Sequence, residues 1–308
     1  MAKFSVGMAL GGGGARGIAH IGLLQVMAEH GLSVDRVSGT SAGALIGAMY
    51  ASRPDPVWLE QRFREFLSSR AFKNLGTERL AKRHEGAETV SAFGKRLQDH
   101  FVVNLSLMRQ YVIPRETLNT AVEFLVPARR FQDLELPMTV CATDLQSGKL
   151  VRYQSGDLVL ALANSSSIPG VLEPEISAQS IVVDGGVLSP VPTRALIGKT
   201  DFIIASEITR RALPPLEDVN IYALMMRSEQ LSQRALARHQ ARLADFVFCP
   251  DVMNLHWSQF GAFDELLQNG REEAQNRMRE LKSKLRIARS PLRGIKRRLT
   301  RLARHKPD

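Results

Sequence analysis

The feature that most constrains the fold of this chain is the crowding of glycine near its start. Of the 23 glycines in 308 residues, ten lie within residues 11–47. Because glycine has no Cβ, such a cluster predicts backbone that turns sharply or approaches other backbone closely. An apolar run over residues 4–10 precedes the first four glycines, and apolar residues at helical spacing over residues 15–30 follow them. The N-terminal segment is therefore predicted to be a buried strand, a glycine loop and a helix.

The rest of the chain alternates apolar strand-like runs with helical patterns. This order predicts an α/β fold in which a mostly parallel central sheet is sandwiched by helices. Residues 57–112 lack a strand pattern and carry scattered aromatic side chains, so we expect a helical insertion there that could act as a lid. We expect a catalytic domain over residues 4–210, a helix–strand extension packed on it over residues 211–270, and a basic helical tail over residues 271–308.

The net charge of +10 belongs to the C-terminal end of the chain. Residues 271–308 carry 14 Lys or Arg and 4 Asp or Glu, whereas the first 270 residues carry 27 of each sign. A basic segment of this kind favours an anionic partner, either a membrane surface or a nucleic acid. We expect no nucleic acid, because residues 271–308 contain no aromatic side chain and the body of the protein has no basic excess.

Within the basic segment, residues 290–308 show the pattern of an interfacial helix. One helical stripe is apolar and the positions around it are cationic. The stripe comprises Leu292, Ile295, Leu299 and Leu302. This pattern is typical of a helix that lies on an anionic membrane surface, although a solvated tail or a helix packed on the domain fits it equally well.

Several other classes of protein are not indicated by the sequence. The longest aliphatic run, residues 158–163, is too short to cross a bilayer, and residues 4–10 lack the features of a signal peptide. We therefore expect a cytoplasmic protein, peripheral at the inner membrane surface if the tail binds lipid. No spacing of His, Cys or acidic residues suggests a metal site, and no cofactor is expected.

The first motif is Gly-Gly-Gly-Gly-Ala-Arg-Gly over residues 11–17, between the predicted strand and helix. Backbone N–H groups at a helix N-terminus favour negative charge, so this loop could cradle a dinucleotide phosphate or form an oxyanion hole. The spacing of Gly12, Gly14 and Gly17 matches the dinucleotide fingerprint, but Asp35 lies at the start of the second strand rather than at its end. This motif alone leaves both chemistries and a purely structural turn open.

The second motif is Gly-Thr-Ser-Ala-Gly over residues 39–43. A nucleophile elbow holds its serine in a strained turn, so the residues two before and two after it must be almost free of side chain. Gly39 and Gly43 meet this requirement. The alternative is that Ser41 only caps a helix after a glycine-rich turn. The order strand, turn and helix favours the nucleophile.

A serine nucleophile needs a base, and histidine is poorly placed to supply it. Only one strand and one helix precede the elbow, which argues against the usual α/β-hydrolase order of serine, acid and histidine. None of the seven histidines lies in a motif. His256 is the one loosely placed candidate for a catalytic triad.

The third motif supplies a carboxylate instead. Residues 181–186 read Ile-Val-Val-Asp-Gly-Gly, which places Asp184 at the end of a buried strand. A carboxylate within hydrogen-bond reach of Ser41 could accept the proton of the attacking hydroxyl. The alternative for Asp184 is a simple turn residue, and Asp144, which follows another predicted strand, is the rival carboxylate.

Together the three motifs resemble the patatin-like phospholipase family, whose signature is a glycine loop, a G-x-S-x-G elbow and a D-G-[G/A] triplet in that order. In this chain they are residues 12–17, 39–43 and 184–186, and the resemblance extends over roughly residues 4–206. The resemblance implies a serine acyl hydrolase of the phospholipase A or lysophospholipase type. It implies that Ser41 is the nucleophile and Asp184 the proton acceptor of a Ser–Asp dyad.

The resemblance also implies roles for the surrounding residues. The amides of Gly12, Gly13 and Gly14 are expected to form the oxyanion hole, and Arg16 to hold the loop or a lipid phosphate. The expected supporting residues are Arg16, Gly17, Gly39, Gly43, Gly185 and Gly186. Two alternatives from other classes remain, a catalytically silent module that binds lipid surfaces and a dinucleotide-binding oxidoreductase.

Overall fold

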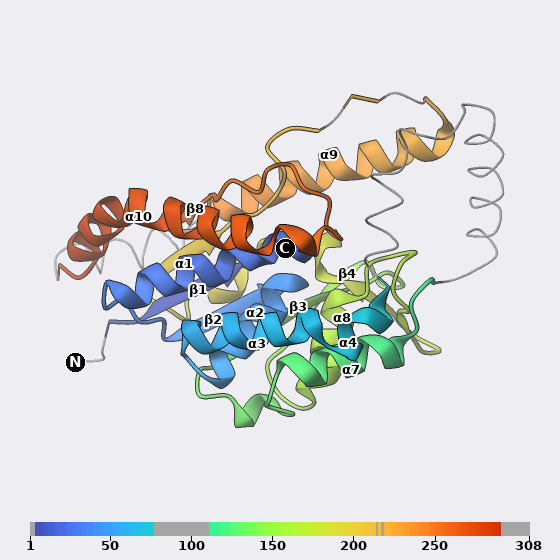
Figure 1. Cartoon of the computed structure of the whole chain (residues 1–308), viewed down its shortest axis with the longest axis horizontal. Coiled ribbons are helices and arrows are strands. Elements are labelled where there is room, and N and C mark those ends of the chain that lie inside the picture. The colour runs from blue at the N-terminus through green and yellow to red at the C-terminus, as the bar shows by residue number, and fades with distance from the viewer. Residues whose placement is uncertain (1–3, 77–110, 214, 217–218, 291–308) are drawn as a thin grey trace.

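The computed structural model describes residues 4–76, 111–213, 215–216 and 219–290. Within this part of the chain, eight strands form one sheet at the centre of the molecule (Figure 1). The strands are β1 (Val6–Leu10), β2 (Arg36–Thr40), β3 (Met138–Asp144), β4 (Lys149–Tyr153), β5 (Glu175–Ile176), β6 (Ile181–Asp184), β7 (Phe202–Ser206) and β8 (Phe246–Phe248).

The sheet is mostly parallel, as predicted. Its order is β5-β6-β3-β2-β1-β7-β8, and β4 pairs with β3 off this path. The run from β3 to β8 is parallel, whereas β4 and β6 are antiparallel to β3 and β5 is antiparallel to β6. Strands β1, β3 and β7 are buried along their whole length, which explains why β1, and β7 up to Ser206, are apolar runs without polar alternation.

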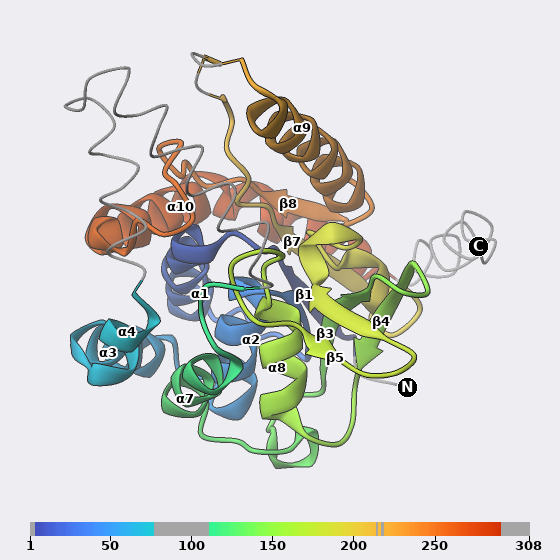
Figure 2. The same ribbon diagram turned by 90° about the vertical axis from the view of Figure 1, so that its right-hand side faces the viewer.

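Helices cover both faces of the sheet, and one face carries a thicker layer of helices than the other. The helices are α1 (Ile18–Glu29), α2 (Ala42–Ser52), α3 (Pro56–Ser68), α4 (Arg70–Leu75), α7 (Arg115–Leu125), α8 (Leu158–Ser166), α9 (Ile221–Ala241) and α10 (Phe263–Ala288). Figure 2 shows α1, α2 and α8 beside the sheet, with α3, α4 and α7 further out. Met8 and Leu10 of β1 face this thick layer, whereas Ala9 faces a small cluster formed with the C-terminal end of α9.

The C-terminal helix α10 packs lengthwise on α1, as Figure 1 shows. The two helices approach so closely that a Cβ added to Gly22 or Gly270 would lie 2.0 Å from a backbone oxygen of the other helix. The domain boundary expected at residue 270 lies inside this continuous helix. Residues 271–288 therefore belong to the packed extension, and the separate basic tail expected over residues 271–308 can begin only after Ala288.

The described part of the segment expected as a helical insertion, residues 57–112, belongs to the main core. Phe63 and Phe66 of α3 and Phe72 of α4 are buried in that core. Residues 77–110 of this segment, and with them the expected lid, lie outside the described residues. The apolar stripe expected within residues 290–308 also lies outside them. No helix in the described ranges is long and apolar enough to cross a bilayer.

Candidate active site

Ser41 occupies a strained turn between β2 and α2. Its backbone has φ 54° and ψ −126°, a combination that is rare for a residue with a side chain. Ser41 stands at the N-cap position of α2, but its side chain makes no capping hydrogen bond. The interpretation of Ser41 as an ordinary helix cap is therefore not supported, and its hydroxyl is available for another role.

The glycines on either side of Ser41 are sterically required. A Cβ on Gly43 would lie 2.2 Å from the Leu10 carbonyl oxygen, and a Cβ on Gly39 would lie 2.5 Å from the Ala44 Cα. No real Cβ approaches backbone so closely, so β1, β2 and α2 can meet only where both side chains are absent. The spacing in the sequence predicted this requirement, and these close backbone contacts are its steric cause.

Asp184 lies beside Ser41 because of the strand register on β3. Thr40, the last residue of β2, pairs with Cys141, and Asp184, the last residue of β6, pairs with the next residue, Ala142. The ends of β2 and β6 are therefore neighbours, and the Ser41 side chain lies close enough to the Asp184 carboxyl to act on its pKa. Both residues are nearly buried, each with 7% of its surface exposed.

The surroundings of Asp184 make it a stronger base than a free aspartate. Burial raises the pKa of its carboxyl to about 6, with a small contribution from the charge of Glu229, although hydrogen bonds from the Ser41 hydroxyl and the Gly186 amide lower it. The Gly186 amide donates to Oδ1 over 2.6 Å, so the expected turn role of Asp184 is also present. Gly185 is required here, because a Cβ would lie 2.2 Å from the Cys141 carbonyl oxygen.

The glycine loop runs directly against the serine. A Cβ on Gly12 would lie 3.3 Å from the Ser41 Cβ. The Gly12 amide donates to the Pro190 carbonyl over 2.9 Å, so it is already engaged and unsuited to the oxyanion role expected for it. Within the described residues the amides of Gly13 and Gly14 have no recorded acceptor. Of the three amides expected to form an oxyanion hole, these two therefore remain as candidates.

Side chains and loops from distant parts of the sequence hold this loop in place. Arg16 donates from Nε to the Gly13 carbonyl over 2.9 Å, which agrees with the loop-holding role expected for it. Burial, together with the nearby charge of Arg210, lowers the pKa of Arg16 to about 10. The Ala15 amide donates to the Trp257 carbonyl over 2.7 Å.

Two residues to which the sequence assigned no role, His20 and Ser165, also support the site. His20 is fully buried between the Gly11 carbonyl and the Ser206 hydroxyl, 2.9 Å from each, and burial lowers its pKa to about 4. The imidazole is therefore neutral, with Nε2 donating to the carbonyl. The Ser165 hydroxyl accepts a hydrogen bond from the Ser41 amide over 2.9 Å and fixes the elbow. Neither residue lies in one of the three motifs, so the motifs give no signal of these long-range contacts.

Asp144 and His256, the other candidates for the base, form hydrogen bonds with other residues. The Asp144 carboxylate accepts hydrogen bonds from Ser147 and from the amides of Gln146 and Ile181, and the bond from Ser147 contributes most to lowering its pKa. The His256 ring bonds to the Ser258 hydroxyl over 2.8 Å. Neither residue is therefore placed as Asp184 is.

The dinucleotide-binding alternative requires an acidic residue beside the glycine loop, and Asp35 does not lie there. Asp35 bonds to the Val6 amide over 2.8 Å at the start of β1 and β2, whereas the glycine loop follows the end of β1. An acid that binds a ribose must lie at the loop end of the second strand.

The described residues also contain no group of three or more His, Cys, Asp or Glu side chains that could hold a metal ion.

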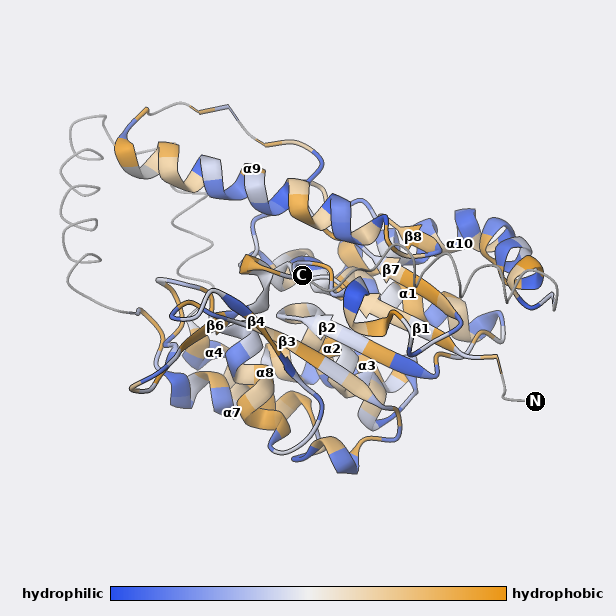
Figure 3. Cartoon of the chain, turned by 180° about the vertical axis from the view of Figure 1, so that it is seen from behind, coloured by the Kyte–Doolittle hydropathy of each residue, from blue (hydrophilic) through white to orange (hydrophobic). Residues whose placement is uncertain are grey.

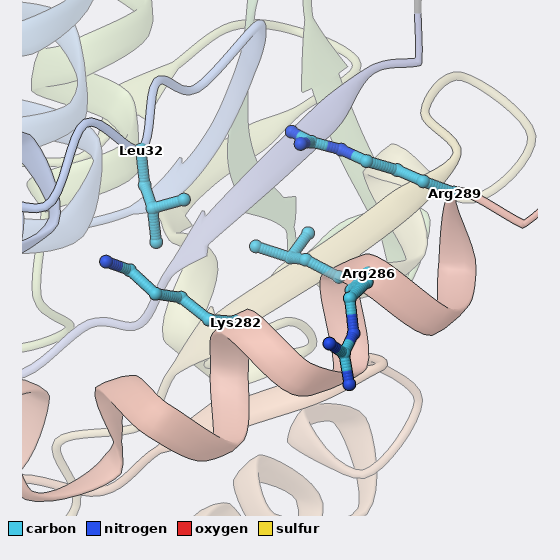
Figure 4. A pocket seen from close by; sticks show the side chains of 5 residues that line it. Leu32, Lys282, Arg286 and Arg289 are labelled. Atoms are coloured by element: carbon cyan, nitrogen blue, oxygen red, sulfur yellow. The ribbon is translucent and has the colours of Figure 1, made fainter.

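A shallow cavity of about 300 Å³ lies at the opposite end of the sheet from Ser41. It is lined by Leu32, Lys282, Leu285, Arg286 and Arg289. Figure 4 shows that the cationic side chains point in different directions rather than toward one centre. None of the predicted site residues lines this cavity, so we do not assign it to the reaction.

Comparisons with known proteins agree with this site. The sequence profile of the patatin-like phospholipase family matches residues 8–197, a range that contains the glycine loop, the elbow and the Asp-Gly-Gly triplet. The chain belongs to the patatin-like phospholipase family. The family is one of lipid acyl hydrolases, and the predicted membership is confirmed.

The chain spans about half the length of the first curated relatives that it matches. An uncharacterized NTE family protein of Mycobacterium tuberculosis is 31% identical over 217 residues, which cover 69% of this chain and 51% of that protein. Lysophospholipase NTE1 of Mycosarcoma maydis is 25% identical over 201 residues, or 63% of this chain and 9% of that protein. Among solved structures, VipD from Legionella pneumophila aligns with a TM-score of 0.46 and 16% identity over 89% of this chain and 67% of that one.

Proposed function

We propose that this chain is a serine acyl hydrolase that cleaves fatty-acyl esters of phospholipids or lysophospholipids through a Ser41–Asp184 dyad. One observation carries the proposal. A serine held in a strained elbow, with no capping hydrogen bond from its side chain, lies beside a buried carboxyl group. The family supports a lipid substrate, and the exact ester is part of the proposal.

In the first half of the reaction, the Ser41 Oγ attacks the ester carbonyl carbon while its proton passes to Asp184. The carbonyl oxygen becomes an oxyanion, which accepts hydrogen bonds from the Gly13 and Gly14 amides. Collapse of this intermediate breaks the ester C–O bond, and Asp184 returns the proton to the departing alcohol oxygen. The fatty acid is then held as an ester of Ser41.

In the second half, a water molecule attacks the acyl-enzyme and gives one proton to Asp184. The oxyanion forms again at the same amides, the Ser41 Oγ leaves with the proton from Asp184, and the fatty acid is released. A carboxylate with a pKa of about 6 is ionised at neutral pH and still basic enough for this transfer. Each preorganised oxyanion donor contributes about 10²–10³ in rate in known enzymes, so the loop carries a large share of the catalysis.

Labelling with a fluorophosphonate probe tests the proposal, because such a probe reacts only with an activated serine. We expect the wild-type protein to be labelled at Ser41 and to hydrolyse a short soluble ester. Ser41→Ala and Asp184→Asn should each lose about 10³-fold or more in turnover, since nucleophile and base act as one unit. Asp144→Asn is the matched control, because it removes a carboxylate at the end of a neighbouring strand and should leave turnover nearly unchanged.

Three outcomes would contradict the dyad. Full activity in Asp184→Asn with loss in Asp144→Asn would move the base to Asp144. Loss confined to His256→Ala would indicate a triad. A folded wild-type protein that binds lipid but is neither labelled nor active would be a silent lipid-binding module.

A further inference from the structure

The N-terminal half of α9 exposes apolar side chains to solvent, the opposite of an ordinary surface helix. Surface helices normally turn their apolar side chains toward the core. Near the N-terminus of α9 the large apolar side chains point outward instead. Their exposed fractions are 80% for Ile221, 48% for Leu224, 67% for Met225 and 52% for Leu231. With 3.6 residues per turn, these four positions share one stripe of the helix, which we call the α9 stripe.

The inward side of the same half of α9 is polar. Gln230, Gln233 and Arg234 are half-buried there. Near its C-terminal end α9 packs on the protein through Ala237 and Ala241, which join a small buried cluster. Figure 3 shows the consequence, with hydrophobic residues at the N-terminal end of α9 where the helix projects from the body.

The polar side of α9 also lies over the candidate site. The Gln233 Nε2 atom is 3.5 Å from the position that a Cβ on Gly186 would take. Glu229 is close enough for its charge to act on Asp184. Leu231, at one end of the α9 stripe, lies in the same turn as Glu229 and Gln233 but on the outer side of the helix. A surface that covers the stripe therefore reaches the part of α9 that borders the Ser41–Asp184 pair.

We propose that the α9 stripe docks on the acyl region of a phospholipid surface and so presents that surface to Ser41. The inference rests on the proposed function for its substrate but concerns a separate surface. The stripe is convex and projects from the body, so a fluid acyl phase can close around it without a matching groove. α9 carries three arginines and one glutamate. Arg234 lies on the inward side, but Arg227 and Arg238 leave a small excess of positive charge, which complements anionic head groups next to the acyl phase.

Sedimentation with vesicles of phosphatidylcholine and phosphatidylglycerol tests the proposal. The full chain carries Ser41→Ala in every sample, so that no lipid is consumed during the measurement. We expect Met225→Gln/Leu231→Gln to weaken vesicle binding about tenfold, which corresponds to about 1.4 kcal/mol. The two side chains are exposed, so the thermal unfolding temperature should not change.

The matched control is Val57→Gln/Leu160→Gln, which removes apolar side chains that are 59% and 39% exposed on α3 and α8. This pair should bind vesicles within about twofold of the parent, as expected for surface substitutions outside an interface. In the active protein, the α9 pair should lower hydrolysis of vesicle phospholipid about tenfold. Hydrolysis of a short soluble ester should be unchanged.

These measurements separate the inference from the proposed function. Absence of ester hydrolysis would overturn the function, while sedimentation would still decide the role of the stripe. Equal binding by the α9 pair and its parent would overturn the inference, as would equal losses in the α9 and control pairs. A parent chain that does not sediment with vesicles would also overturn it. If the α9 pair instead dissociates an oligomer without weakening vesicle binding, a second copy covers the stripe and the inference is wrong.

Discussion

Helices α2 and α9 border the same candidate site and are packed in opposite ways. α2 is apolar on nearly every side and is enclosed by the protein, with Ile46 and Met49 only 1% and 0% exposed. α9 turns glutamines inward and leaves Met225 and Leu231 more than half exposed. Other parts of the protein bury the apolar surface of α2, whereas no described residue covers the apolar stripe of α9.

This difference separates two requirements of the proposed chemistry. The strained backbone of Ser41 persists only because its neighbours leave no alternative, and close packing around α2 provides that constraint. A helix that meets a lipid surface needs the reverse, an apolar face that the protein itself does not cover. The comparison predicts that small changes around α2 are severe and that small changes on exposed segments are mild.

The largest effect should follow from adding one methyl group beside the elbow. In Gly43→Ala the new Cβ would lie 2.2 Å from the Leu10 carbonyl oxygen, so α2 must move away from β1. Overpacking of this kind costs about 1–3 kcal/mol and occasionally more, and we expect the upper end of that range because backbone is in the way. Thermal unfolding and soluble-ester turnover should both show the loss.

Gly261→Ala is the matched control for this change. Gly261 is exposed, and a Cβ there would meet nothing within 4 Å. Its unfolding free energy should stay within about 0.5 kcal/mol of wild type. Equal stability of the two variants would show that the elbow is not packed as tightly as the comparison requires.

The parts of the site that could be predicted from the sequence are those determined by residues adjacent in the chain. Gly39 and Gly43 must lack side chains because of the turn in which they lie, and Asp184 follows a strand whose apolar pattern is visible in the sequence. The strand expected over residues 4–10 and the helix expected over residues 15–30 match β1 and α1 within a few residues for the same reason, since hydrophobic periodicity is a local signal.

The parts that were missed depend on contacts between distant segments. Nothing near Gly12 in the sequence shows that its amide is bonded to Pro190, and nothing near His20 shows that it supports Gly11 from α1. The boundary expected at residue 270 follows a change of charge, whereas α10 continues through that position. The outward stripe of α9 was missed because periodicity shows that a helix has an apolar face, but not which way that face points.

The next effect concerns pH, because Asp184 must be ionised to accept a proton. With its pKa raised to about 6, kcat/KM on a soluble ester should fall about tenfold per unit below pH 6 and level off above it. A pH profile between 4 and 8 measures this. A profile whose acidic limb lies near pH 4 would contradict the burial argument.

The raised pKa of Asp184 also makes the folded protein less stable as pH rises. Between about pH 4 and 6 the folded protein binds more protons at Asp184 than the unfolded chain, so this residue lowers stability as pH rises through that window. Asp184→Asn should therefore stabilise the protein above pH 6, by about 3 kcal/mol for a shift of about two units, and not below pH 4. Asp144→Asn should have the opposite sign, because hydrogen bonds hold the pKa of Asp144 below its usual value.

The smallest effect on catalysis is expected from deleting residues 291–308. The helix that leads into this segment ends with Arg289 against Phe4, just before β1, whereas Ser41 follows the opposite end of the parallel strand β2. A basic tail rooted there can attach the protein to an anionic membrane, with about 1 kcal/mol from each nearby Lys or Arg, but it does not orient Ser41.

The deletion should therefore weaken sedimentation with anionic vesicles at low salt, and high salt should reproduce the loss in the full chain. Turnover of a soluble ester should change by less than about twofold, the range of a surface change away from the site. Vesicle binding that ignores both salt and the deletion would show that the tail is not a membrane contact. Binding that disappears with the tail but survives Met225→Gln/Leu231→Gln would reverse the comparison, since lipid contact would then lie at the far end of the sheet from the dyad.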